Sequence, residues 1–230
     1  MKIENLAVLT EFLASPNTSK KTQALFKQLD NAYKKNPASA TTQGFLNKYI
    51  SSIGNDISTS CASYVLTDTF DQLSNASKAS VIRDIFGPGI RVGYNKSSEI
   101  SRVIYDGILK QNKVAQRSSL AALDEKRYNT VLKIAIGDSL DKNYDAVSNF
   151  ITGSFAQLVQ TGNRNTIIET AASLKSSHVD IVSKRTTTSA KPCDYCAERS
   201  GVIVSVNSTK GDDLFHFHDH CHCELEIFVR

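Results

Sequence analysis

The chain has 230 residues, of which 40% are hydrophobic and 22% are charged. This balance supports one good domain with a small companion, or two small domains, and excludes general disorder. No run of about 20 apolar residues is present, which excludes a membrane-spanning helix. The formal net charge of +4 is mildly basic, and it permits sequence-independent contact with DNA without establishing it.

The N-terminal part has the apolar spacing of amphipathic helices. Leu9 and Leu13 belong to a stripe that predicts a short helix ending near Pro16. A second helix follows, with lysines around its apolar stripe. From residue 41 to about residue 75 the pattern stays helical, and we expect Gly54 and its polar neighbours to divide it into two helices.

Glycine, proline and polar runs divide the rest of the chain. Gly87-Pro88-Gly89 predicts the end of one helix and a loop across residues 91–97. Thr166-Ile167-Ile168-Glu169 has the pattern of a capping box and predicts a new helix start. The polar residues 185–190 mark a boundary. The expected regions are a helical region at 1–90, a second helical region at 91–184 and a β module at 185–230.

Helical spacing also covers residues 120–134 and 139–161. Between Lys78 and Arg127 basic residues exceed acidic ones by about two to one, which favours a basic patch. In the last region, three apolar runs predict strands at 202–206, 214–218 and 224–229. So few residues bury little core, and a bound metal would supply the missing cohesion.

Cysteine and histidine gather in that last region, which holds four of the five cysteines and four of the five histidines. Cys193 and Cys196 have the two-residue spacing with which a tight turn places two sulfurs on one tetrahedral ion, and His218 and Cys221 repeat it. The isolated Cys61 has the pattern of a small buried residue. We therefore predict one structural zinc site.

The identity of the later ligands stays open at this level. A regular strand would place His218 and Cys221 on opposite faces, so they share a metal only if the chain turns between them. Alternatively, Cys221 and Cys223 converge. The order of candidates is Cys193 and Cys196, then Cys221, then His218, then Cys223, and one of the last three is not a ligand.

Two other uses of these cysteines compete with zinc. Two disulfides would suit an oxidising compartment, but Glu4 and Glu11 interrupt the apolar core that an export signal needs. We therefore expect folding in a reducing, intracellular environment. A redox C-x-x-C normally opens a helix after a strand, whereas Pro192 and the polar run before it predict a loop.

The order of residues in this part of the chain is distinctive. It runs through Gly162-Asn163-Arg164-Asn165-Thr166-Ile167, Lys184-Arg185, Cys193-Asp194-Tyr195-Cys196-Ala197-Glu198-Arg199-Ser200-Gly201-Val202-Ile203, and Phe217-His218-Asp219-His220-Cys221-His222-Cys223. It resembles the C-terminal part of tailed-phage minor head (minor capsid) proteins of the Mu F-like head-morphogenesis class. The nearest likeness is to those of actinobacterial phages, and it covers about residues 160–225.

The resemblance implies a function in the virion. It predicts a structural minor head protein near the portal vertex, assembled in the host cytoplasm, which assists head assembly or DNA delivery. Its partners would be portal or capsid proteins, with DNA contact in addition and no membrane. The family offers no catalytic residues to carry over, so we expect no enzymatic activity. The expected fold is mainly α, a helical body with a small C-terminal zinc-stapled β module.

An enzyme is the alternative. Asp219-His220-Cys221-His222 after a C-x-x-C is similar to the core of ββα-metal (HNH-like) nucleases. In that case His220 would activate water and Asp219 would bind Mg²⁺. Such sites need a further helix, and only seven residues follow Cys223. A third alternative is a zinc-dependent DNA-binding adaptor, which the long helical part of the chain disfavours.

Overall fold

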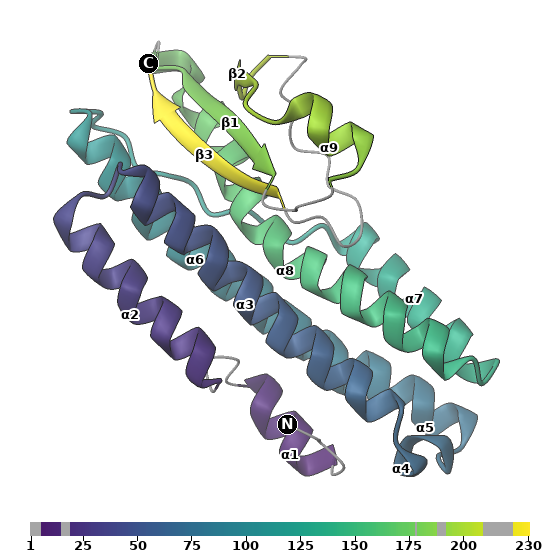
Figure 1. Ribbon diagram of the computed structural model, residues 1–230. Helices are drawn as coiled ribbons and strands as arrows, with labels where there is room; N and C mark the ends of the chain where they lie inside the picture. The colour runs from purple at the N-terminus through teal and green to yellow at the C-terminus, as the bar shows by residue number, and fades with distance from the viewer. Residues whose placement is uncertain (1–5, 15–18, 178, 188–191, 209–222) are drawn as a thin grey trace. The chain divides into compact units, whose positions relative to one another are not determined.

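The computed structural model describes residues 6–14, 19–177, 179–187, 192–208 and 223–230. They form mainly helix, with one small sheet towards the C-terminus (Figure 1), as the sequence predicts. The helices are α1 (Leu6–Ala14), α2 (Lys20–Lys35), α3 (Ala40–Val65), α4 (Asp68–Asp71), α5 (Asn75–Ser80), η1 (Val81–Phe86), α6 (Gly87–Gln111), α7 (Glu125–Leu140), α8 (Tyr144–Leu174), η2 (Lys175–Ser177) and α9 (Asp194–Arg199). The strands are β1 (Ile181–Thr187), β2 (Ile203–Ser205) and β3 (Cys223–Val229). Among the described helices, none combines the length and apolar character that crossing a bilayer requires.

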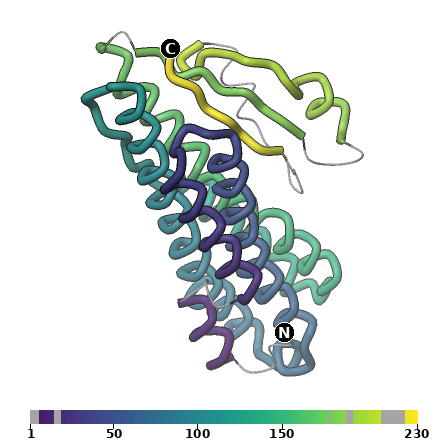
Figure 2. The backbone as a smooth tube through the Cα atoms, turned by 60° about the vertical axis from the view of Figure 1, so that its left-hand side comes forward, coloured from purple at the N-terminus to yellow at the C-terminus, as the bar shows by residue number. Residues whose placement is uncertain are grey.

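The chain folds into two compact units, each assembled from three separate segments. Unit 1 comprises residues 1–23, 50–96 and 123–161, and unit 2 comprises residues 24–49, 97–122 and 162–230. Helices α2, α3, α6 and α8 each include residues of both units, and the course of the backbone along them can be followed in Figure 2. Each unit therefore combines residues that are distant in sequence.

Helix α3 runs through Gly54 without interruption, so the predicted break there is wrong. A Cβ atom at Gly54 would lie 2.8 Å from the carbonyl oxygen of Ala156 in α8. Only a residue without a side chain permits this approach of two helix backbones within unit 1. Gly54 therefore allows α3 and α8 to pack closely and does not end a helix.

The segment Gly87-Pro88-Gly89 begins α6, and the predicted loop at 91–97 is helical. Because α5, η1 and α6 follow one another without a break, Pro88 lies inside a continuous helical run, and a π-helical turn is one of the irregularities that accompany a missing N–H there. The π-helix η1 precedes it directly. A Cβ atom at Gly89 would lie 2.9 Å from the side chain of Leu13, so this glycine also permits close packing in unit 1.

Two other predicted helix starts are also wrong. Thr166 lies inside α8, where its Oγ1 donates to the Gly162 carbonyl at 2.7 Å and shares a hydrogen bond with Ser98. Its hydroxyl is thus satisfied without capping a helix. Helix α7 begins after Asp124, which caps it by accepting from the Arg127 amide, rather than at residue 120.

Unit 1 has an aromatic core in which Phe86 packs edge-on against Tyr64 and Phe155. Lys78 is buried beside it, 1% exposed, and its ammonium donates to the Tyr144 hydroxyl at 2.7 Å. Lys78 therefore does not belong to a surface patch, contrary to the sequence-based count of basic residues. Cys61 is fully buried, as predicted.

The sheet lies in unit 2 and has the antiparallel order β2-β1-β3 (Figure 1). Strand β3 confirms the predicted strand at 224–229, and β2 lies within the predicted strand at 202–206. The central strand β1 was not predicted, and its residues 181–184 fall in the expected helical region. The predicted strand at 214–218 lies outside the described residues.

Buried amides from the helices of unit 2 hold the outer edge of β3. Gln43 of α3 donates to the Ile227 carbonyl at 2.9 Å and accepts from the Ile227 amide at 2.6 Å. Asn47, one turn later, donates to the Leu225 carbonyl at 2.9 Å. An open strand edge exposes such groups to other chains, so these amides complete the sheet as a further strand would.

The same network continues into the other helices of unit 2. Asn163 of α8 donates to Asn47 at 3.2 Å and accepts from the hydroxyl of Tyr105 in α6. Burial raises the pKa of Tyr105, and the hydrogen bond to Asn163 acts in the opposite direction. Buried hydrogen bonds therefore join the last strand directly to α3, and through Asn47 and Asn163 to α8 and α6, which favours a unique register.

Candidate metal centre

The pairing of β1 with β3 brings two predicted ligand segments towards each other. In the register of this pair, Thr187 lies opposite Cys223. Cys223 is the first residue of β3, and Thr187 is the last residue of β1, from which the chain continues towards Cys193. The end of the β1–β3 pair therefore carries Cys223 on one strand and, on the other, the residue after which the chain leads to the C-x-x-C.

Cys193 and Cys196 stand at the start of the short helix α9. Cys193 is the N-cap residue, and its carbonyl accepts from the Ala197 amide at 2.9 Å. Its side chain makes no capping hydrogen bond and is exposed, whereas Cys196 is buried. The predicted loop at the C-x-x-C is therefore wrong, because the motif opens a helix after a strand.

The thiol of Cys196 interacts with the thiols of both Cys193 and Cys223. Burial first, and then hydrogen bonds with the thiols of Cys223 and Cys193, raise the pKa of the Cys196 thiol to about 11. The structure thereby brings together three of the five predicted ligands. None of these three cysteines takes part in a disulfide.

The cluster is not a complete ligand set on its own. Within the described part of the chain, no group of three or more His, Cys, Asp or Glu side chains is disposed to hold a metal ion. The other two predicted ligands, His218 and Cys221, lie outside the described residues, as do Asp219 and His220. Cys193 and Cys223 thus each interact with Cys196, and the three do not form a metal site by themselves.

A buried arginine that sequence analysis assigned to the boundary region stands beside the cluster. Arg185 of β1 is fully buried, and its guanidinium donates to Cys196 Sγ at 3.3 Å. This cation acts to lower the pKa of Cys196 and so opposes the effect of burial. Ile181, Ser183 and Arg185 are all buried, which places Arg185 on the inner face of β1, and the polar character of Ser183 and Arg185 hides this strand in the sequence.

Tyr195 completes the surroundings of this arginine. The Arg185 guanidinium lies 5.4 Å from the centre of the Tyr195 ring, and Arg199 lies 3.7 Å from it. The Arg185 carbonyl accepts from the Gly201 amide at 2.7 Å, where Gly201 has a φ of 81°. These contacts fix α9 to β1, so the C-x-x-C and the guanidinium keep a fixed relation.

The arrangement suits the chemistry of thiolate sulfur. A guanidinium beside a thiol favours the thiolate, which is the form that binds a soft divalent metal or attacks a disulfide. A redox pair uses two cysteines, and here a third, Cys223, arrives from a different strand. The group around Cys196 therefore differs from a simple dithiol pair, because it includes a sulfur from a second segment.

The family comparison agrees with a viral origin. The model of the VG15 protein family matches residues 66–229, which is most of the chain. The chain belongs to this family, which is a family of phage proteins. Among curated proteins and among solved structures, nothing matches the chain.

Proposed function

We propose that this chain is a structural minor head protein of a tailed bacteriophage, located near the portal vertex. The observation that carries the proposal is the family match, which runs from the helices of unit 1 to the final strand of unit 2. The resemblance of residues 160–225 to Mu F-like minor head proteins supports the same assignment. Portal or capsid proteins are the proposed partners.

We propose further that the cysteine cluster holds one structural zinc ion. Cys193, Cys196 and Cys223 supply three thiolates, and either His218 or Cys221 supplies the fourth ligand. Bound zinc would cross-link α9 to the start of β3 and stabilise the fold. The donor set fits, because Arg185 offsets part of the negative charge of a zinc site rich in thiolates.

Metal analysis tests this centre. Protein purified under reducing conditions should contain about one zinc per chain, and Cys196→Ser should reduce the content to near zero. Cys61→Ala is the matched control, because Cys61 lies buried in α3 within unit 1, and it should keep the full zinc content. Zinc-free reduced protein, or disulfides among these cysteines, would refute the proposal.

The location is tested on particles. Mass spectrometry of purified, DNA-filled virions should detect the chain at low copy relative to the major capsid protein. Detection only in the lysate of infected cells would contradict a place in the head.

We propose no catalytic activity. Purified protein should not nick plasmid or cleave linear DNA with Mg²⁺ or Mn²⁺. Cleavage that disappears in His220→Ala would establish the nuclease alternative instead, with His220 as the base that activates water.

A further inference from the structure

The C-terminal end of α6, in unit 2, closes with an uncommon residue. The Val114 amide donates to the Leu109 carbonyl at 3.0 Å and the Lys113 amide donates to the Lys110 carbonyl at 3.1 Å. This is the Schellman arrangement, in which the residue after the helix takes the left-handed conformation. That residue is Lys113, with a φ of 60°.

Glycine is the ordinary residue at this position, because a side chain is strained at positive φ. In this chain a lysine occupies the position, at a cost in backbone strain. Its charge interacts favourably with the C-terminal end of the helix dipole, and the backbone turn places it at the end of α6. Lys142, after α7 in unit 1, has the same conformation with a φ of 58°, and it offers a direct comparison.

Two glutamines tie other segments of unit 2 to this helix end. Gln111 accepts from the Ala38 amide at 3.2 Å, which holds the turn between α2 and α3. Gln116 donates to the Ser177 hydroxyl at 2.5 Å, which holds η2. The segment after α6 is thereby fixed against η2, which begins with Lys175.

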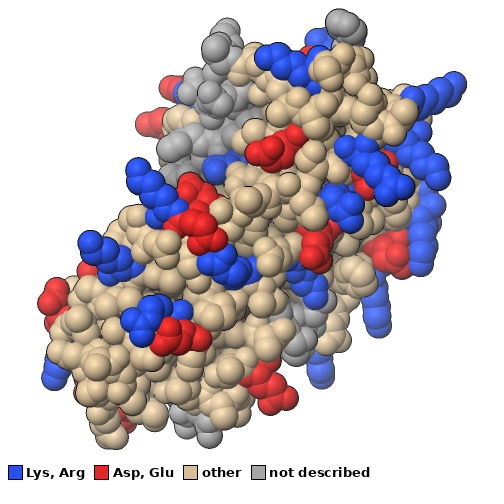
Figure 3. All heavy atoms as spheres, turned by 180° about the vertical axis from the view of Figure 1, so that it is seen from behind, with Lys and Arg blue, Asp and Glu red and all other residues tan. Residues whose placement is uncertain are grey.

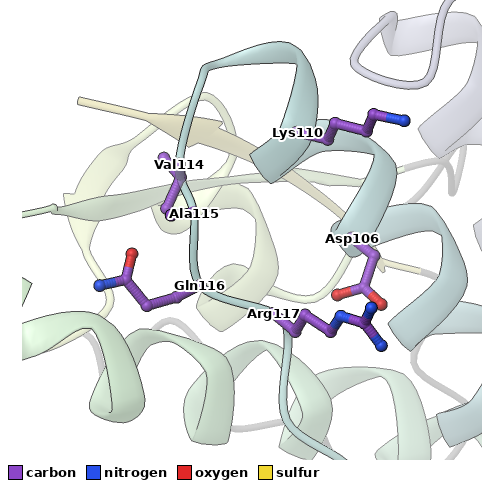
Figure 4. A pocket seen from close by; sticks show the side chains of 6 residues that line it. All are labelled: Asp106, Lys110, Val114, Ala115, Gln116 and Arg117. Atoms are coloured by element: carbon purple, nitrogen blue, oxygen red, sulfur yellow. The ribbon is translucent and has the colours of Figure 1, made fainter.

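A hollow of about 420 Å³ lies at the same place. Its lining residues are Asp106, Lys110, Val114, Ala115, Gln116 and Arg117. Figure 4 shows Asp106 and Lys110 on α6 and the other four on the segment that follows it. Two of the six carry a positive charge, and Lys113 lies between them in the sequence.

The charge around the hollow is predominantly positive. Lys110, Lys113, Arg117 and Lys175 are exposed, and none of them takes part in a salt bridge found among the described residues. The acid, Asp106, accepts from the amide and the hydroxyl of Ser118, each at 2.6 Å. The carboxylate of Asp106 is thus hydrogen-bonded to the segment that follows α6. In Figure 3, Lys and Arg side chains outnumber Asp and Glu along the upper right margin of the visible face.

We infer that this end of α6, defined by Lys110, Lys113, Arg117 and Lys175, binds the phosphate backbone of duplex DNA without reading its sequence. The inference rests on the proposed function in a DNA-filled head, where a duplex is the abundant polyanion. Exposed cations that are not neutralised by protein carboxylates gain most from phosphates, because counterions are released from the DNA. The hollow lined by Lys110 and Arg117 is a concave surface against which one DNA strand could place its phosphate groups.

The test uses the full-length protein and a labelled duplex of about 20 base pairs, with fluorescence anisotropy over a series of salt concentrations. The wild type should bind two unrelated sequences equally, with affinity that falls steeply as salt rises. Lys113→Gly removes one charge and relieves the backbone strain at once. It should therefore keep or raise the melting temperature, while the affinity falls about eightfold at 0.1 M salt and the slope of log K against log salt is reduced by about 0.9.

Lys142→Gly is the matched control, because it makes the same change at the same backbone conformation in unit 1. It should leave the affinity and the salt slope near those of the wild type. Equal losses in both variants, or no loss in Lys113→Gly, would overturn the inference. Full competition by millimolar inorganic phosphate would show a small-anion site and would also overturn it. The presence of the chain in virions is measured independently, so absence of DNA binding would refute only this inference.

Discussion

The contact of Gln43 with the backbone of Ile227 can be tested by replacing one side chain. Gln43 is 2% exposed and satisfies both the amide and the carbonyl of Ile227. Gln43→Leu keeps a similar volume and helix propensity but leaves both backbone groups buried without their partner. The change therefore isolates the polar contact that closes the edge of β3.

The expected cost follows from these two groups. A buried polar group that loses its partner costs about 1–3 kcal/mol, and at about 1.5 kcal/mol each, in the lower part of that range, the two groups together cost about 3 kcal/mol. Burying the apolar leucine side chain offsets roughly 1 kcal/mol. We expect a net loss of about 2 kcal/mol, which corresponds to about a 30-fold change in an equilibrium constant.

Two measurements check this value. Urea unfolding followed by circular dichroism gives the change in free energy for the transition that includes the sheet. Amide hydrogen exchange by NMR gives a local reading, because the Ile227 amide should exchange about 30-fold faster if its opening is easier by about 2 kcal/mol.

Gln28→Leu is the matched control, since Gln28 is an exposed residue of α2 in the same unit. It should change stability by less than about 0.5 kcal/mol. If Gln43→Leu resembled this control in both measurements, the side chain would not be what secures β3, and the reasoning would be wrong.

Two further outcomes are expected. Gly54→Ala should destabilise unit 1 by about 1–3 kcal/mol in a thermal unfolding assay, because the new Cβ would lie 2.8 Å from the Ala156 carbonyl oxygen. This loss is expected although alanine has the better helix propensity. In the same assay Gly137→Ala in α7, where nothing lies within 4 Å, should stabilise by about 0.5–1 kcal/mol. A stabilised Gly54→Ala would refute the packing explanation. Hydrogen bonds from Arg83 and Ser80 hold the pKa of Asp84 at about 2, below the usual value. The contribution of Asp84 to stability is therefore fully present above about pH 4 and is lost as the pH falls towards 2. NMR titration should show this pKa rising in Arg83→Gln, and an Asp84 that titrates normally in the wild type would contradict the assignment.

A predominantly helical chain with a C-terminal β segment could be predicted from local pattern. Helices α1 and α2 follow from apolar spacing, and β3 follows from a short apolar run, because these signals depend only on neighbouring residues. The Cys193 and Cys196 pair is likewise visible as a two-residue spacing. The zinc assignment itself remains a prediction that metal analysis tests.

Tertiary structure decided what the glycines and the central strand do. Gly54 and Gly89 have the same local appearance whether they end a helix or allow another segment to approach, and only the packing partner, Ala156 or Leu13, settles it. Strand β1 was missed because Lys184 and Arg185 appear polar in the sequence. Arg185 can be buried because α9 brings Cys196 to it, whose sulfur accepts a hydrogen bond from the guanidinium. The meeting of Cys223 with Cys196 depends in the same way on the pairing of β1 with β3, which joins residues distant in the chain. Local sequence therefore determined that most of the chain is helical and that β3 forms, whereas long-range contacts determined where helices continue, that β1 forms and which side chains meet.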